Sequence, residues 1–204
     1  MSRFVTEIGL LTIKPSTNLD EHIDEVIALI SRQEGFRQLK WGRWEEDENK
    51  IQIFINWDDI SFHEKFTQST DYSALFAVLT PILAAEPVLL HAHFDEESIN
   101  RILSDPVVEL ATFFSIGDGF GEAVDKTLSV GAQAPGYLFH TRADVVEELA
   151  PPTGGEKGKA HFAAISWNSL EERWKATERE DVREAGGALV AKLGGYEVHH
   201  VRFQ

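Results

Sequence analysis

Two glutamates stand in otherwise apolar stretches and could do chemistry with histidines that lie far along the chain. Glu7 and Glu109 each occupy the middle of a short aliphatic run, and His91, His93 and His200 lie in similar runs. A carboxylate is costly to bury without a partner. A carboxylate beside a histidine can hold the imidazole in one tautomer for acid–base catalysis. The alternative is a structural ion pair or hydrogen bond that fixes the register of two strands.

Other side chains could complete a pocket around such a pair. Tyr72 and His63 lie in one predicted helical region with Phe66. Tyr72 is either a proton donor or a hydroxyl satisfied at a helix junction, and His63 either packs or assists proton transfer. Trp57 and Trp167 close equivalent strands, which favours a packing role. The residues that we expect to bind substrate are Arg37, Trp41, Phe66, Leu89, His93, Glu109, His140 and His200.

The candidate residues recur because the chain repeats itself. Four landmarks return in one order: VTEIGLL at 5–11 as VVELATF at 107–113, GF at 35–36 as GY at 136–137, FINW at 54–57 as AISW at 164–167, and HAHF at 91–94 as HVRF at 200–203. The second copy carries an extra polar, Pro- and Gly-containing segment at 147–159, which is typical of a surface loop between strands. We predict a first unit at 1–96, a linker with a short helical turn at 97–105 and a second unit at 106–204.

Each copy shows the same order of elements. In the first copy, β-branched and aliphatic residues predict a strand over 5–13. A helix follows, with Asn18 and Glu21 as its capping box and Gly35 as its stop. Strands are predicted over 36–45 and 51–57, a helical region from the capping residue Asp59 to about residue 85, and a last strand over 87–94. In the second copy, Ser169 and Glu172 form another capping box.

The order βαββαβ predicts an α+β fold made of two tandem ferredoxin-like units. Each unit leaves one face of its antiparallel sheet without helices, and we expect the two units to pack sheet to sheet as a fused dimeric α+β barrel. The first and last strands of such a sheet are neighbours. Side chains alternate along a strand, so Glu7 can lie beside His91 or His93, and Glu109 beside His200.

Composition excludes several classes of function. The chain has 204 residues, no cysteine, and 34 acidic against 19 basic residues, for a net charge of −15. Thiolate metal sites and cysteine nucleophiles are therefore excluded, and nucleic acid and anionic membranes are poor partners for so acidic a chain. We find no signal-peptide layout, no membrane-spanning stretch and no nucleotide or flavin motif. We expect a cytoplasmic protein, a monomer or homodimer, without cofactor and without metal.

The chain resembles the dimeric α+β barrel superfamily over nearly its whole length, as two fused copies. That superfamily includes antibiotic-biosynthesis monooxygenases (ABM domains), stress-responsive A/B barrel proteins and olivetolic-acid-type polyketide cyclases. The matching marks are the opening strand at 5–14, the run Lys40-Trp41-Gly42, Trp57 closing the third strand and the stretch Phe66-x-x-Ser69-x-x-Tyr72. These patterns are specific for the fold rather than for one activity.

The resemblance implies which positions face the cavity. It places Glu7, Leu89 and His91 there. In cyclases of this type a histidine ends the last marked stretch and acts as base with a helix tyrosine. Here Tyr72 stands at that histidine position, and His63 lies nearby. The nearest counterpart in the second copy is Trp174-x-x-Thr177-x-x-Glu180, which implies that only the first copy keeps a full site.

We expect an enzyme of secondary metabolism that needs no cofactor and acts on a hydrophobic polyketide- or terpenoid-like small molecule. Tyr72 and His91 would exchange protons with the substrate, Glu7 would orient His91, and His63 or His93 would assist in a cyclisation or isomerisation. One alternative is a cofactor-free, antibiotic-biosynthesis-type monooxygenase. Another is a non-catalytic ligand-binding or stress-response barrel.

Overall fold

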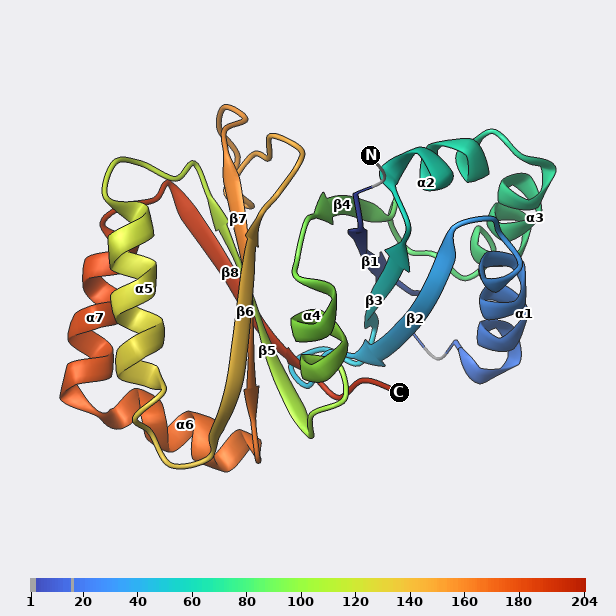
Figure 1. Cartoon of the computed structure of the whole chain (residues 1–204). Helices are drawn as coiled ribbons and strands as arrows, with labels where there is room; N and C mark the ends of the chain where they lie inside the picture. Colours follow the sequence, from blue (N-terminus) through green and yellow to red (C-terminus); the bar gives the residue numbers. More distant parts are fainter. Residues whose placement is uncertain (1–2, 16) are drawn as a thin grey trace. The chain divides into compact units, whose positions relative to one another are not determined.

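The computed structural model describes residues 3–15 and 17–204, and these residues form two compact units. The first unit comprises the chain up to His93 together with Gln204, and the second comprises Phe94–Phe203. Gln204 belongs to the first unit, where its backbone N–H donates to the carbonyl of Trp41 at 2.9 Å. Each unit contains one four-stranded sheet with helices beside it (Figure 1).

The first unit is a βαββαβ fold whose second helical region is divided in two. Its elements are β1 (Val5–Thr12), α1 (Asp20–Ser31), β2 (Phe36–Arg43), β3 (Lys50–Trp57), α2 (Ile60–Thr67), α3 (Thr70–Leu79) and β4 (Val88–Ala92). The antiparallel sheet has the order β2-β3-β1-β4. The first and last strands are therefore neighbours, as the sequence predicts for a ferredoxin-like unit.

The second unit repeats this plan and adds a helix before it. Its elements are α4 (Glu96–Ile102), β5 (Val107–Phe114), α5 (Phe120–Gly131), β6 (Tyr137–Asp144), β7 (Ala160–Trp167), α6 (Leu170–Glu178), α7 (Glu180–Val190) and β8 (Gly195–Val201). The sheet order is β6-β7-β5-β8. The short helix predicted in the linker is α4, which packs on β6 and β7 and buries Ile99 and Ile102 completely. The polar insertion forms the connection between β6 and β7.

Three details of the helices differ from the sequence prediction. Asn18 does not cap α1: Leu19 holds the N-cap position, and the Asn18 amide donates instead to the Glu21 carboxylate at 2.8 Å. Gly35 does not end α1, which stops at Ser31; it takes a positive φ of 77° in the turn before β2, where a Cβ atom would clash with the Phe62 ring. The helical region from Asp59 breaks between α2 and α3.

That break has a local cause. At the junction the Ser69 hydroxyl accepts a hydrogen bond from the Tyr72 backbone N–H at 3.2 Å and caps a new helix. A serine that bonds the backbone favours a cap over a helix interior. The other predicted caps are confirmed: Asp59 accepts from the backbone N–H of Ser61, and Ser169 from that of Glu172.

In both units one face of the sheet packs against helices and forms a core. In the first unit the alternating residues Val5, Leu11, Ile53 and Trp57 are buried there with the apolar side of α1. Glu7 shares this face by parity. No helix in the described part of the chain is both long enough and apolar enough to cross a bilayer. The expected packing of one sheet on the other stays a prediction.

Candidate functional site

The strand register of the first unit places the two expected partners opposite each other. Glu7 on β1 is the direct partner of His91 on β4, and Gly9 is the partner of Leu89. The side chains of Glu7 and His91 are both buried, with 5% and 7% of their surface exposed. The second unit has the same register, with Glu109 on β5 opposite His200 on β8. Both copies thus hold a buried carboxylate at the same point of the sheet.

A third residue lies between Glu7 and His91. His63 on α2 is buried, and its Nε2 lies 3.5 Å from the Glu7 carboxylate Oε1. Its Nδ1 lies 2.9 Å from Nε2 of His91, and the two imidazole rings are 4.9 Å apart. His63 therefore contacts both members of the predicted pair, Glu7 and His91. The orientation of His91 by Glu7 stays a prediction.

This order determines how protons can be arranged. When Glu7 is a carboxylate, it can accept a proton from Nε2 of His63. Nδ1 of His63 is then left to accept the Nε2–H of His91. Trp57 completes the group by donating its indole N–H to Oε2 of Glu7 at 2.9 Å. The result is a chain of polar contacts, one ion-pair contact and one hydrogen bond, which we call the first-unit relay: Glu7, His63 and His91.

Glu7 also borders an apolar cavity between the sheet and the helices of the first unit. The cavity has a volume of about 50 Å³. Glu7 and Tyr72 are its polar residues, and the others are Gly9, Leu11, Val26, Ile30, Ile53, Ile55, Phe66, Leu75, Phe76, Leu79, Pro87 and Leu89. The carboxylate rather than the imidazole of His91 is thus the relay group at the cavity wall. Two predicted binding residues, Phe66 and Leu89, line it.

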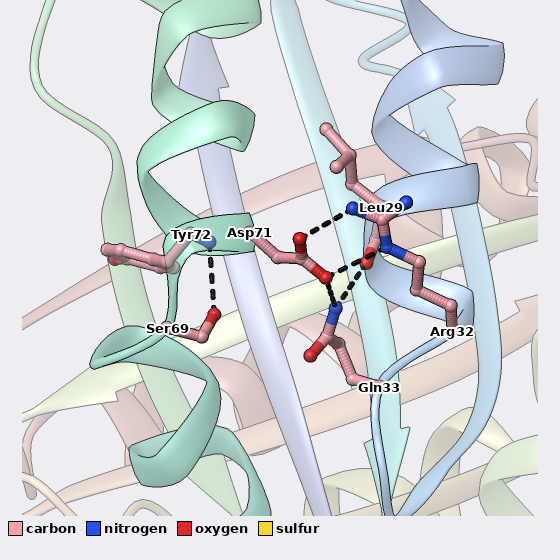
Figure 2. A network of polar contacts seen from close by, with 6 residues as sticks. All are labelled: Leu29, Arg32, Gln33, Ser69, Asp71 and Tyr72. Atoms are coloured by element: carbon pink, nitrogen blue, oxygen red, sulfur yellow. Dashed lines mark hydrogen bonds and ion pairs between the residues drawn. The ribbon is translucent and has the colours of Figure 1, made fainter.

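Tyr72 is held at the cavity by the start of α3. Ser69 caps the helix there. Asp71, directly before Tyr72, accepts hydrogen bonds from Arg32 at 2.8 Å and Gln33 at 2.7 Å, which follow the end of α1 (Figure 2). The Tyr72 ring packs between Phe66 and Phe76, at centroid distances of 5.3 and 5.0 Å. Neither Asp71 nor Gln33 was singled out from the sequence.

The surroundings keep the Tyr72 hydroxyl protonated. Burial raises the pKa of Tyr72, and the negative charge of Glu7 raises it further. A tyrosine with a raised pKa is a hydrogen-bond donor throughout the physiological range. The cavity therefore presents a carboxylate that accepts a proton and a phenol that donates a hydrogen bond.

The second unit replaces the relay by a fixed ion pair. Arg173 donates to Glu109 through Nε at 3.0 Å and through Nη2 at 2.9 Å, and Trp167 donates its indole N–H at 3.0 Å. Arg173 stands four residues after the N-cap Ser169, as His63 stands four residues after Asp59. The sequence analysis missed Arg173, although this equal spacing from two recognisable caps could have found it.

The other predicted residues of the second unit lie elsewhere on this face. His200 packs edge to face against Trp174 at 5.0 Å. His140 is bonded through Nδ1 to the Tyr137 hydroxyl. Burial and then the charge of Arg142 lower the pKa of His140. Neither histidine forms a relay with Glu109 like that of the first unit.

Three residues predicted to bind substrate do not line the first cavity. Arg37 lies at a β-bulge between Phe36 and Gln38, which turns it to the surface, where it pairs with Asp58 at 2.5 Å. Trp41 packs into the core. His93 follows the end of β4, so the strand alternation no longer applies, and its Nδ1 bonds the carbonyl of Phe4 at 2.9 Å. These three residues therefore lie outside the lining of this cavity, and their role in binding stays a prediction.

The three residues of the first-unit relay also have the spacing of metal ligands. Glu7, His63 and His91 could each offer one ligand atom to a metal ion, since these atoms lie within 4.8 Å of one another.

Trp57 and Trp167 pack in the cores, as predicted, but their indole N–H groups also donate hydrogen bonds to the buried carboxylates. Recurrence of a tryptophan with each glutamate was the sequence signal for that second role.

Comparison with protein families and with curated proteins finds no match to the sequence. Comparison of folds does. An anthrone oxidase-like protein superposes with a TM-score of 0.76 at 18% identity, covering 100% of this chain and 94% of its own. A provisionally assigned monooxygenase from Lactobacillus acidophilus NCFM gives 0.59 at 12% identity, covering 98% and 94%. One from Fusobacterium nucleatum gives 0.61 at 9% identity, covering 99% and 93%. The chain therefore has the tandem ferredoxin-like fold of these ABM-domain-like proteins.

Proposed function

We propose that the chain is an enzyme that transfers protons on a hydrophobic, polyketide- or terpenoid-like small molecule, using its own side chains and no cofactor. The observation that carries this proposal is the position of Glu7. It is a buried carboxylate at the wall of an apolar cavity, it shares that cavity with Tyr72, and it is backed by His63 and His91. Titratable groups that converge on one apolar pocket are the usual sign of acid–base chemistry.

In the proposed mechanism Glu7 is the general base. It removes a proton from an acidic C–H or O–H of the substrate, while the Tyr72 hydroxyl donates a hydrogen bond to the oxygen on which negative charge develops. His63 and His91 adjust their shared protons as the charge of Glu7 changes. The product is a cyclised or isomerised form of the same molecule.

The size of the cavity limits what can enter it. A volume of about 50 Å³ is small beside the roughly 300–1,000 Å³ of typical ligand pockets. We therefore expect the cavity to receive the reacting end of a substrate, such as the activated carbon between two carbonyl groups, rather than a whole ring system.

The test uses a small probe with an acidic carbon, such as acetylacetone, and follows solvent deuterium exchange at that carbon by NMR. Glu7→Gln keeps the size of the side chain and an oxygen for the Trp57 N–H, so the fold should survive. We expect exchange to slow by a factor of at least about 100. The matched control is the double variant Glu109→Gln/Arg173→Met in the second unit, which removes the equivalent carboxylate without leaving Arg173 buried and unpaired. It should leave the exchange rate near that of the wild type. Equal rates in wild type and Glu7→Gln would refute the proposal.

A second candidate function is oxygenation by dioxygen alone. It is supported by the names of the structural neighbours, an anthrone oxidase-like protein and provisionally assigned monooxygenases. The same base could start it by forming a carbanion that reduces dioxygen. Oxygen uptake during turnover separates the two, because cyclisation and isomerisation consume none. Treatment with EDTA should leave either activity intact if no metal ion takes part.

A further inference from the structure

We infer that the second unit contains a separate binding cavity for a flat, apolar molecule that carries a carbonyl or phenolic oxygen. Between its sheet and helices lies a cavity of about 390 Å³, against about 50 Å³ at the equivalent place in the first unit. Only the larger volume falls in the range of roughly 300–1,000 Å³ that small-molecule sites occupy. The inference is independent of the proposed reaction in the first unit.

Smaller side chains on the two helices account for part of the extra space. Counted from the N-caps Ser69 and Arg179, the sixth and seventh residues are Leu75 and Phe76 in α3 but Ala185 and Gly186 in α7. Leu75 and Phe76 line the first cavity, whereas a Cβ atom added at Gly186 would meet nothing within 4 Å. The second unit is therefore open where the first unit is filled.

The other replacements lie on the preceding helix and on the sheet. Phe66 is seven residues after the cap Asp59, and Ala176 is seven residues after the cap Ser169. On the third strand of each unit, Ile53 opposite Gly9 becomes Ala163 opposite Ala111. Gly186 and Ala163 line the larger cavity, and Ala176 lines a smaller pocket that shares Glu109 and Arg173 with it. Smaller side chains at these positions leave open space, because packed interiors otherwise leave few voids.

Arg173 gives the cavity a hydrogen-bond donor that has no partner among the described residues. Arg173 lines the cavity, and 12% of its side-chain surface is exposed. Its Nε and Nη2 groups donate hydrogen bonds to Glu109. Its Nη1 has no hydrogen-bond partner among the described residues. The hydroxyl groups of Thr127 and Thr177, which also line the cavity, bond backbone carbonyls. Glu109, Arg183 and Tyr196 are the remaining polar residues of the lining, and the other lining residues are apolar or glycine.

These features define the chemistry of the ligand. An apolar ring system would fill the space, and one oxygen acceptor would take the free N–H groups of Arg173 Nη1. Glu109 already balances the charge of the guanidinium, so a neutral carbonyl or phenol fits as well as an anion. Arg173 cannot act as a general base, since its guanidinium stays protonated. We therefore assign this cavity to binding.

The test compares 1-naphthol with 1-methylnaphthalene, which lacks the oxygen, by ligand-observed NMR and fluorescence titration on the full chain. We expect 1-naphthol to bind the wild type, and the double variant Ala185→Leu/Gly186→Phe to weaken binding at least tenfold. Both substitutions copy residues that pack well in the first unit. Gly121→Leu, which adds a side chain at an exposed position of α5, is the control and should bind like the wild type.

A second variant tests the donor and guards against misfolding of the first. Arg173→Lys keeps a cation beside Glu109 but loses the guanidinium fork. It should weaken 1-naphthol about fivefold and leave 1-methylnaphthalene unchanged. Ala163→Ile, which copies Ile53, should block both probes. Failure of the wild type to bind 1-naphthol, or equal binding by the wild type and both cavity-filling variants, would overturn the inference.

Discussion

The two units share one frame, by which we mean the arrangement of strands and helices around a buried glutamate, and they differ in the helix residue that contacts this glutamate. In each, a buried glutamate on the first strand faces a histidine on the last strand and accepts the indole N–H of a tryptophan on the third strand. The first unit adds His63 from its helix, and the second adds Arg173 at the equivalent position. One substitution therefore separates a relay that can change its protonation from an ion pair that cannot.

The unit that has the titratable groups has the smaller cavity. The first unit, which has the titratable groups, is packed with large side chains, whereas the second, with the fixed ion pair, is open. A duplicated chain can diverge in this way because each copy keeps its own core. Chemical groups and binding space are therefore distributed unequally between two copies of one fold.

We expect the largest effect when the first site is converted into the second. His63→Arg should abolish the relay and pair Glu7 permanently, so we expect catalysed exchange to fall by a factor of at least about 100. The unfolding midpoint should stay close to that of the wild type, because the second unit accommodates the same arrangement. Exchange kinetics and urea denaturation on one sample check both. Retained activity would show that Glu7 does not need His63.

A second experiment removes the ion pair from the second unit. Arg173→Ala leaves Glu109 buried with the Trp167 N–H as its remaining described donor, and loss of one partner of a buried pair costs about 3–5 kcal/mol. Denaturant unfolding should show this loss in the free energy of unfolding. The double variant Glu109→Gln/Arg173→Met should recover much of it. A single variant as stable as the wild type would mean that Glu109 takes up a proton at little cost.

A smaller effect concerns pH and a histidine of the second unit. Burial lowers the pKa of His161 from its usual 6.5, although the hydrogen bond that its Nδ1–H donates to Asp144 at 2.7 Å acts in the opposite direction. A histidine with a depressed pKa in the folded state contributes stability that is present above pH 6.5 and lost as the pH falls through the folded-state value. His161→Gln should therefore flatten the decline of the urea midpoint between pH 7 and pH 5. An unchanged slope would contradict this assignment.

Much of the frame could be predicted from the sequence, because it depends on short-range patterns. Strand alternation placed Glu7 on the same face as its neighbours Val5 and Leu11, and the βαββαβ order placed the first strand beside the last. Those two facts were enough to bring Glu7 next to His91 or His93, and the strand register of the structure selects His91. The capping residues Asp59 and Ser169 could also be predicted from the sequence, because a cap acts on backbone groups two or three residues away.

The site itself depended on how helices lie on the sheet. Periodicity shows that His63 is on a helix, but the rotation and depth of that helix decide that its ring enters between Glu7 and His91. A β-bulge turns Arg37 to the surface. His93 lies beyond the end of β4, where the alternation of side chains along the strand no longer applies. No pattern of residues along one strand predicts such displacements.

The sequence by itself determined the duplication, the fold of each copy and the burial of one carboxylate per copy, since these follow from local hydrogen bonding and hydrophobic periodicity. Only the tertiary structure decided that one carboxylate joins a histidine relay and the other an arginine, and that one cavity is closed and the other open. The reason is that contacts between helix and sheet, and the space left between them, depend on side chains from several distant segments packing at once.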